Sequence, residues 1–187
     1  MKVIGVTGTI GSGKSIVREF LIKRFNCYCV LLSSVIKTEG RKKKTSRREL
    51  QDLGNELRKK YGAHILAKLA VDYLQKNKEM AVIDGIRNPA EAEFLKKTFG
   101  NNFFLIAVDA PKEIRFERLL KRGTERDPKN YEEFIEMDER EMGKGEPEYG
   151  QQVEKCMKMA DFLLINDGRI EEVESKLDEI LKKIMAK

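Results

Sequence analysis

Short apolar runs alternate with longer segments of helical periodicity along the chain. Each run is apolar at successive positions rather than at every second one, as expected of a parallel strand covered on both faces. The five predicted strands are residues 3–6, 27–32, 80–83, 103–108 and 162–165. The predicted helices lie at about 13–25, 46–60, 63–77, 89–99, 111–122, 130–142, 148–159 and 170–185. This alternation predicts an α/β fold with a five-stranded, doubly wound parallel sheet between helical layers.

Two segments interrupt this alternation. Residues 33–77 place two or three helices between the second and third strands, and residues 122–150 are polar and rich in glycine. Both are expected to lie over the carboxyl edge of the sheet, where α/β proteins bind ligands. No composition shift marks a linker, so we expect a single domain over residues 1–187.

The strongest chemical signal lies between the first predicted strand and the first predicted helix. It is the motif G-x-x-x-x-G-K-[ST], in the strand-to-helix context that a phosphate loop requires. Lys14 is expected to reach the β- and γ-phosphates of ATP, and the Ser15 hydroxyl to ligate Mg²⁺. The predicted nucleotide-binding residues of this segment are Gly8, Thr9, Ile10, Gly11, Ser12, Gly13, Lys14, Ser15 and Ile16.

Asp84 follows the apolar strand at residues 80–83. The carboxyl ends of parallel strands meet at one edge of a sheet, so Asp84 is expected beside Lys14. There its carboxylate would support Mg²⁺ or lie near an attacking hydroxyl. The alternative is a turn residue before Gly85, because Asp-Gly is common in turns.

The composition narrows the class of protein without naming a ligand. Hydrophobic residues make up 41%, and 37 Lys and Arg against 31 Asp and Glu give a net charge of +6. This apolar content excludes a disordered chain, and the charge favours anionic partners. Three cysteines are an odd number, which argues against a disulfide framework. No apolar run approaches the ~20 residues of a membrane span. We expect a cytoplasmic protein with no signal peptide; its oligomeric state is left open.

With these residues assembled, the chain resembles the nucleoside monophosphate kinase branch of the P-loop proteins. Within that branch it is similar to dephospho-coenzyme A kinase-like archaeal proteins and to deoxynucleoside monophosphate kinases. The first likeness rests on residues 6–15, Asp109-Ala110-Pro111, Arg115, Arg118 and Arg122, and Ala160-Asp161 with Asn166. The second rests on residues 48–58 and 83–91. The resemblance implies a P-loop three-layer sandwich in which residues 33–77 form an acceptor-binding insertion and residues 122–150 a lid.

One departure from the dephospho-coenzyme A kinases concerns the acceptor. Those enzymes carry an acidic residue at the end of the second strand, where this chain has Ser33 and Ser34. A hydroxyl acceptor benefits from a base, whereas a phosphate acceptor is already anionic. The sequence therefore favours a nucleoside or deoxynucleoside monophosphate as the acceptor, and dephospho-coenzyme A second, unless Asp84 supplies the carboxylate.

Arginine side chains are expected to surround the transferring phosphate, because charge develops on its oxygens. Arg118, Arg122 and Arg126 are predicted to act as lid arginines, with Arg122 and Asn166 beside the adenine; the alternative is a solvated basic face. The predicted acceptor-binding residues are Ser33, Lys37, Arg48, Gln51, Asn55, Arg58 and Arg87. Arg87 is the first candidate for an acceptor phosphate, which guanidinium binds bidentately, and pairing with Glu91 is its alternative. The glutamate-rich residues 132–141 are expected to be an exposed helix face.

The sequence thus predicts a kinase that transfers the γ-phosphate of ATP, with Mg²⁺, to a nucleotide-like acceptor. An alternative is a nucleotide-gated ATPase or switch that contacts RNA or the ribosome through the basic residues 41–48. That run lacks aromatic residues for base stacking, so a solvated loop is the favoured interpretation. A third possibility is a non-catalytic binder of AMP-like ligands.

Overall fold

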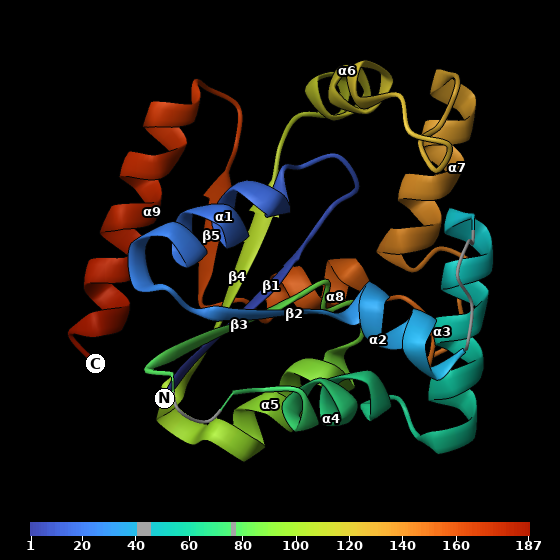
Figure 1. The fold of residues 1–187 in the computed structure, drawn as a ribbon. Helices are drawn as coiled ribbons and strands as arrows, with labels where there is room; N and C mark the ends of the chain where they lie inside the picture. The colour runs from blue at the N-terminus through green and yellow to red at the C-terminus, as the bar shows by residue number, and fades with distance from the viewer. Residues whose placement is uncertain (41–45, 76–77) are drawn as a thin grey trace.

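One parallel sheet of five strands forms the centre of the computed structural model, which describes residues 1–40, 46–75 and 78–187 (Figure 1). The strands are β1 (Lys2–Gly8), β2 (Tyr28–Leu31), β3 (Met80–Asp84), β4 (Phe103–Asp109) and β5 (Phe162–Ile165). Their order is β2-β3-β1-β4-β5, and each neighbouring pair is parallel. The doubly wound α/β fold predicted from the sequence is confirmed.

Helices cover both faces of this sheet. The helices α1 (Lys14–Phe25) and α9 (Ile170–Met185) lie on one face, and α4 (Ile65–Asp72), α5 (Pro89–Phe99) and α8 (Val153–Lys158) lie on the other (Figure 1). Val3 of β1 packs in one buried cluster with Leu66 and Leu95, whereas Ile4 packs with Val17 in the opposite layer. Successive residues of β1 therefore face different helical layers, which explains why the strand is apolar without alternation.

The two segments that interrupt the alternation reach the carboxyl edge, except for α4, which covers a face of the sheet. The first contains α2 (Leu32–Glu39), α3 (Arg47–Tyr61) and α4, and the second follows α6 (Lys112–Arg122) and contains α7 (Tyr131–Met142); a short 3-10 turn, η1 (Gly100–Asn102), precedes β4. Figure 1 shows α7 standing beside α3. Phe134 of α7 also packs with Ile10 and Leu119 in a buried cluster. The helix α7 thus contacts both the loop after β1 and the helices inserted after β2.

Two helices are shorter than the sequence predicted. In the segment at 63–77, of which residues 76–77 lie outside the described residues, the described part forms a helix only over α4, and the segment at 148–159 is helical only from Val153. Before that residue the chain is held by tertiary hydrogen bonds. Asn88 Nδ2 donates to the carbonyls of Glu148 and Gly150, and Gln152 N donates to the Arg87 carbonyl at 2.7 Å. These bonds occupy backbone groups that a longer helix would have used.

Across residues 1–40, 46–75 and 78–187, no helix is long and apolar enough to cross a membrane.

Candidate active site

The loop from Gly8 to Ser15 joins β1 to α1 at the carboxyl edge of the sheet. Gly11 and Gly13 adopt positive φ angles of 75° and 87°, which side chains rarely allow. A Cβ atom on Gly13 would also collide with Asn166, whose Nδ2 donates to the Ser12 carbonyl at 2.7 Å. The glycines of the motif are thus required by the local backbone and by this close approach of Asn166.

Lys14 lies against the loop that precedes it. Its Nζ donates to the carbonyls of Gly8 at 2.7 Å and Thr9 at 2.6 Å. Burial lowers the pKa of Lys14 to about 8; the charge of Glu141 opposes this shift and that of Arg87 adds to it. A lysine with this pKa carries a full charge only at neutral and lower pH.

We therefore expect the affinity for ATP to depend on the protonation of Lys14. Below about pH 7 the ammonium is present and attracts phosphate, and as the pH rises through about 8 the free protein loses this charge. The dissociation constant for ATP should then increase with pH, by up to about tenfold per unit. Titration calorimetry from about pH 7 to about pH 9.5 measures this change.

The control for the pH experiment is Lys14→Met, which keeps an unbranched side chain of nearly the same length without a titratable group. Its weaker affinity should not fall further with rising pH. Equal slopes for the wild type and the Lys14→Met variant would contradict the prediction.

A cavity of about 590 Å³ opens over the loop. Most of the predicted nucleotide-site residues contribute to its lining, together with Ser33 and Arg87 from the predicted acceptor set. The predicted nucleotide-site residues in this lining are Ile10, Gly11, Gly13, Lys14, Ser15, Ile16, Asp84, Arg118, Arg122 and Asn166. Arg118 does not extend freely into solvent, because it donates to the Asn166 backbone carbonyl at 3.0 Å and to its side-chain oxygen at 3.2 Å. The cavity is large enough for a nucleotide and is lined by positive charge where the phosphates would lie.

Ser15 and Asp84, the two predicted Mg²⁺ ligands, both line this cavity. Their hydroxyl and carboxylate oxygens are the kind of ligand that Mg²⁺ prefers. Asp84 is buried, and its Oδ2 accepts from Arg18 Nη1 at 3.0 Å. Sequence reasoning missed Arg18, although it lies one helical turn after Lys14 and so on the same side of α1.

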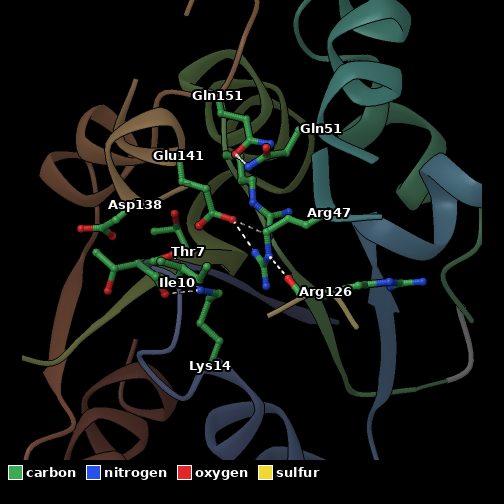
Figure 2. Close-up of polar contacts among 12 residues, drawn as sticks. Thr7, Ile10, Lys14, Arg47, Gln51, Arg126, Asp138, Glu141 and Gln151 are labelled. Carbon is green, nitrogen blue, oxygen red and sulfur yellow. Dashed lines mark hydrogen bonds and ion pairs between the residues drawn. The ribbon is translucent and has the colours of Figure 1, made fainter. Parts of the chain in front are cut away.

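A smaller cavity of about 150 Å³ adjoins the nucleotide cavity. The two share Ser33, Arg47 and Arg87 in their linings, so the arginines stand at the junction. Gln51 Nε2 faces Gln151 Oε1 at 3.5 Å on the far side (Figure 2). The structure thus brings four predicted acceptor residues to one cavity, namely Ser33, Gln51, Arg58 and Arg87.

Glu141 of α7 reaches into the same cavity (Figure 2). Its side chain is 1% exposed, and its Oε1 accepts from Arg47 Nη1 at 2.8 Å and lies 3.6 Å from Arg87 Nη2. Its Oε2 is buried with no hydrogen-bond partner among the residues that the structure describes. Burial by itself would raise the pKa of Glu141, but the positive charges of Arg87, Arg47 and Lys14 outweigh it and lower that pKa.

The expectation that residues 132–141 form an exposed face is wrong for Phe134, Asp138 and Glu141, which are all buried. These residues recur at intervals of four and three, so they share one side of the helix. An inward-facing Phe134 at that spacing was the signal that could have identified the two acids.

Arg47, and not the predicted Arg48, reaches the junction of the cavities. Arg48 is exposed, whereas Arg47 is held by Glu141 and by the Arg126 carbonyl, to which its Nε donates at 3.4 Å. Burial lowers the pKa of Arg47, partly offset by Glu141. Arg126 contributes its backbone to this contact, and Figure 2 shows its guanidinium pointing away from the cluster.

Other predicted residues bind neighbouring parts of the protein. Arg58 forms a buried ion pair with Glu91 at 2.8 Å, which joins α3 to α5 and leaves its guanidinium bound. Glu91 also accepts from the Arg87 backbone N at 2.8 Å, so it is the main chain of Arg87 that pairs with Glu91. Asn55 Nδ2 donates to Glu146. Both side chains therefore have protein partners in this structure, although Arg58 also contributes to the lining of the smaller cavity.

Three more predicted residues lie near the site with different surroundings. Arg122 Nε donates to Asp127 at 2.8 Å, so its charge is already paired. Lys37 lies on α2 and lines neither of the two cavities. Arg115 is buried and bound to Asp138, and its Nη1 donates to the Ile10 carbonyl. It therefore supports the phosphate loop. Of the basic run at 41–48, residues 41–45 lie outside the described residues.

Comparisons with known proteins show the family of this chain. The model of the AAA domain family matches residues 4–142. A UPF0200 protein of Sulfurisphaera tokodaii is 35% identical over 99% of this chain and 98% of that relative. A UPF0200 protein of Methanothermobacter thermautotrophicus is 34% identical over 100% of this chain and 93% of its own length.

Solved structures share the fold at low sequence identity. A shikimate kinase from Acinetobacter baumannii, crystallised with shikimate, has a TM-score of 0.60 at 14% identity and covers 100% of this chain and 94% of its own. TT1252 from Thermus thermophilus has a TM-score of 0.59 at 22% identity over 97% of both chains. These likenesses show a P-loop kinase-like fold, and they do not single out the dephospho-coenzyme A kinase or deoxynucleoside monophosphate kinase branch.

Proposed function

Because this chain belongs to the AAA domain family and to the UPF0200 proteins, with a kinase-like fold, we propose that it is an ATP- and Mg²⁺-dependent phosphotransferase. It transfers the γ-phosphate to a small nucleotide-like acceptor. The observation that carries the proposal is the meeting of two cavities at Arg47 and Arg87. A transferring phosphoryl group must pass between its donor and its acceptor, and positive charge at that junction stabilises it.

The donor side would be built from the loop and its neighbours. Lys14 and the loop amides bind the phosphates, and Asn166, held by Arg118, borders the nucleoside side of the cavity. Ser15 and Asp84 would hold Mg²⁺, which neutralises charge on the β- and γ-phosphates. Arg122 closes the cavity from α6.

The acceptor side would be formed by the insertion after β2 and by the end of β3. Ser33, Gln51 and Arg87 line it, and Arg47 joins them from the first turn of α3. The amide of Gln51 suits a base or sugar, and a guanidinium suits a phosphate group. From the sequence, nucleoside and deoxynucleoside monophosphates rank first as acceptors and dephospho-coenzyme A second, because no carboxylate follows β2. In the structure, however, Glu141 contributes a carboxylate to the lining of this cavity.

An acceptor panel tests the proposal. ATP consumption with Mg²⁺ would be measured against the ribonucleoside and deoxynucleoside monophosphates, the nucleosides, dephospho-coenzyme A and water alone. We expect a rate that depends on an acceptor and exceeds the rate with water by at least about 10²-fold, because the site positions a second reactant beside the phosphate. Turnover with water alone would instead indicate an ATPase, and no turnover would indicate a nucleotide binder.

A further inference from the structure

The orphaned oxygen of Glu141 points to a missing hydrogen-bond donor. Oε1 is bound by Arg47, whereas Oε2 is buried without a partner within the described part of the chain. Leaving a buried carboxylate oxygen unpaired costs free energy, more than for a neutral group. The side chain lines the acceptor cavity, so a ligand in that cavity can supply the donor.

The charge of Glu141 selects the kind of group that can bind there. An ionised carboxylate only accepts hydrogen bonds, so its partner must donate one. A hydroxyl donates, whereas an ionised phosphate is repelled by a carboxylate. The volume of about 150 Å³ and the nearby Ser33 hydroxyl and glutamine amides also suit a compact polar group.

We propose that Glu141 binds the acceptor's hydroxyl and receives its proton, so that the acceptor is an alcohol rather than a phosphate. This inference rests on the proposed phosphotransferase function. The hydroxyl oxygen forms a bond to the γ-phosphorus while the bond from that phosphorus to the β,γ-bridging oxygen breaks. The electron pair of the broken bond leaves with ADP, and the proton passes to Glu141 Oε2 and then to water.

The surroundings of Glu141 match this role. The two arginines that contact its Oε1 line both cavities, so the carboxylate lies beside the junction where the donor and acceptor cavities meet. Arg47 and Arg87 hold Oε1 and keep the group ionised at neutral pH, ready to accept a proton. The proton becomes acidic as the hydroxyl oxygen bonds to phosphorus, so a weak base suffices late in the reaction.

This arrangement also explains the serine at the end of β2. Ser33 lies where the dephospho-coenzyme A kinases carry an acid, yet the cavity still contains a carboxylate because α7 contributes Glu141. The reason to rank a phosphate acceptor above a hydroxyl acceptor is thereby removed.

The first test uses the unaltered protein. Phosphorus NMR of the product from any acceptor that the panel identifies distinguishes a phosphomonoester from a phosphoanhydride. We expect a phosphomonoester, formed on a hydroxyl of a nucleoside, a nucleotide or dephospho-coenzyme A. A phosphoanhydride product would leave the kinase function in place and overturn the role of Glu141. Absence of any phosphorylated product would overturn the kinase function and the inference together.

The second test compares Glu141→Gln with Glu139→Gln. Glu139 lies on the same helix and pairs at the surface with Lys144 at 2.8 Å, so its variant is the matched control. Glu141→Gln should lower kcat about 10²-fold, with the KM for the acceptor changed by less than about fivefold and ATP binding retained. Glu139→Gln should leave both constants unchanged.

A rise in activity of Glu141→Gln with a nucleoside monophosphate would overturn the proposal. That outcome would mean that the carboxylate occupies the place of an acceptor phosphate and has to leave before it binds. An unchanged kcat with the hydroxyl acceptor would overturn it as well.

Discussion

Replacing Lys14 by alanine is expected to reduce the rate of phosphoryl transfer by about 10³-fold, at the upper end of the effect of removing one preorganised electrostatic group. Lys14 is the cation that the loop itself supplies, and it is held by the Gly8 and Thr9 carbonyls at the floor of the nucleotide cavity. An ammonium at this place stabilises the negative charge that moves onto the γ-phosphate during transfer. Steady-state rates with the acceptor that the panel identifies measure the loss.

Lys23→Ala is the matched control for this variant. Lys23 lies on the same helix, in its last turn, and is exposed. The control should retain the full rate, and both variants should show the cooperative unfolding of the wild type. If Lys14→Ala kept its rate within a few-fold of the wild type, the phosphate loop could not be the catalytic centre.

The second large effect is expected on stability, from Asp138→Ala. Both oxygens of Asp138 accept from Arg115, at 2.6 and 3.0 Å, and each side chain is 4% exposed. Removing the carboxylate leaves the buried guanidinium with only the Asp109 carboxylate, 4.0 Å from its Nε, which lowers the free energy of unfolding by about 3–5 kcal/mol. Urea unfolding followed by circular dichroism measures the change.

This variant should also weaken ATP binding, because Arg115 holds the phosphate loop. Its Nη1 donates to the Ile10 carbonyl at 3.1 Å, and the aromatic ring of Phe134 lies 5.3 Å from its guanidinium carbon. Glu139→Ala is the control, since its exposed ion pair with Lys144 contributes about 1 kcal/mol or less. Equal unfolding free energies for the two variants would show that the buried pair does not support the loop.

The proposed phosphotransferase function and the proposed hydroxyl acceptor rest on different residues, so an experiment can contradict one without the other. The Lys14→Ala variant tests whether the phosphate loop catalyses phosphoryl transfer. The Glu141→Gln variant tests whether a hydroxyl oxygen receives the phosphoryl group. The Asp138→Ala variant tests neither proposal, because the buried pair of Arg115 and Asp138 contributes to the stability of the phosphate loop.

Local patterns were enough to predict the sheet and the phosphate loop. Strands buried on both faces are recognisable because the residues that determine them are neighbours in the sequence, as in residues 80–83. The loop from Gly8 to Ser15 is also local, since its glycines satisfy the conformation of that same segment.

The acceptor side was decided by tertiary structure. Adjacent helical residues point about 100° apart, so the choice between Arg47 and Arg48 depends on how α3 is rotated against its neighbours. Glu141 meets Arg47 across 94 positions of the chain, and its burial depends on α7 packing through Phe134. Composition and motifs predicted a nucleotide-binding loop at one edge of a parallel sheet. Only the packing of α3 and α7 decided which charges face the acceptor, because a side chain's partners across the chain are not encoded in its neighbours.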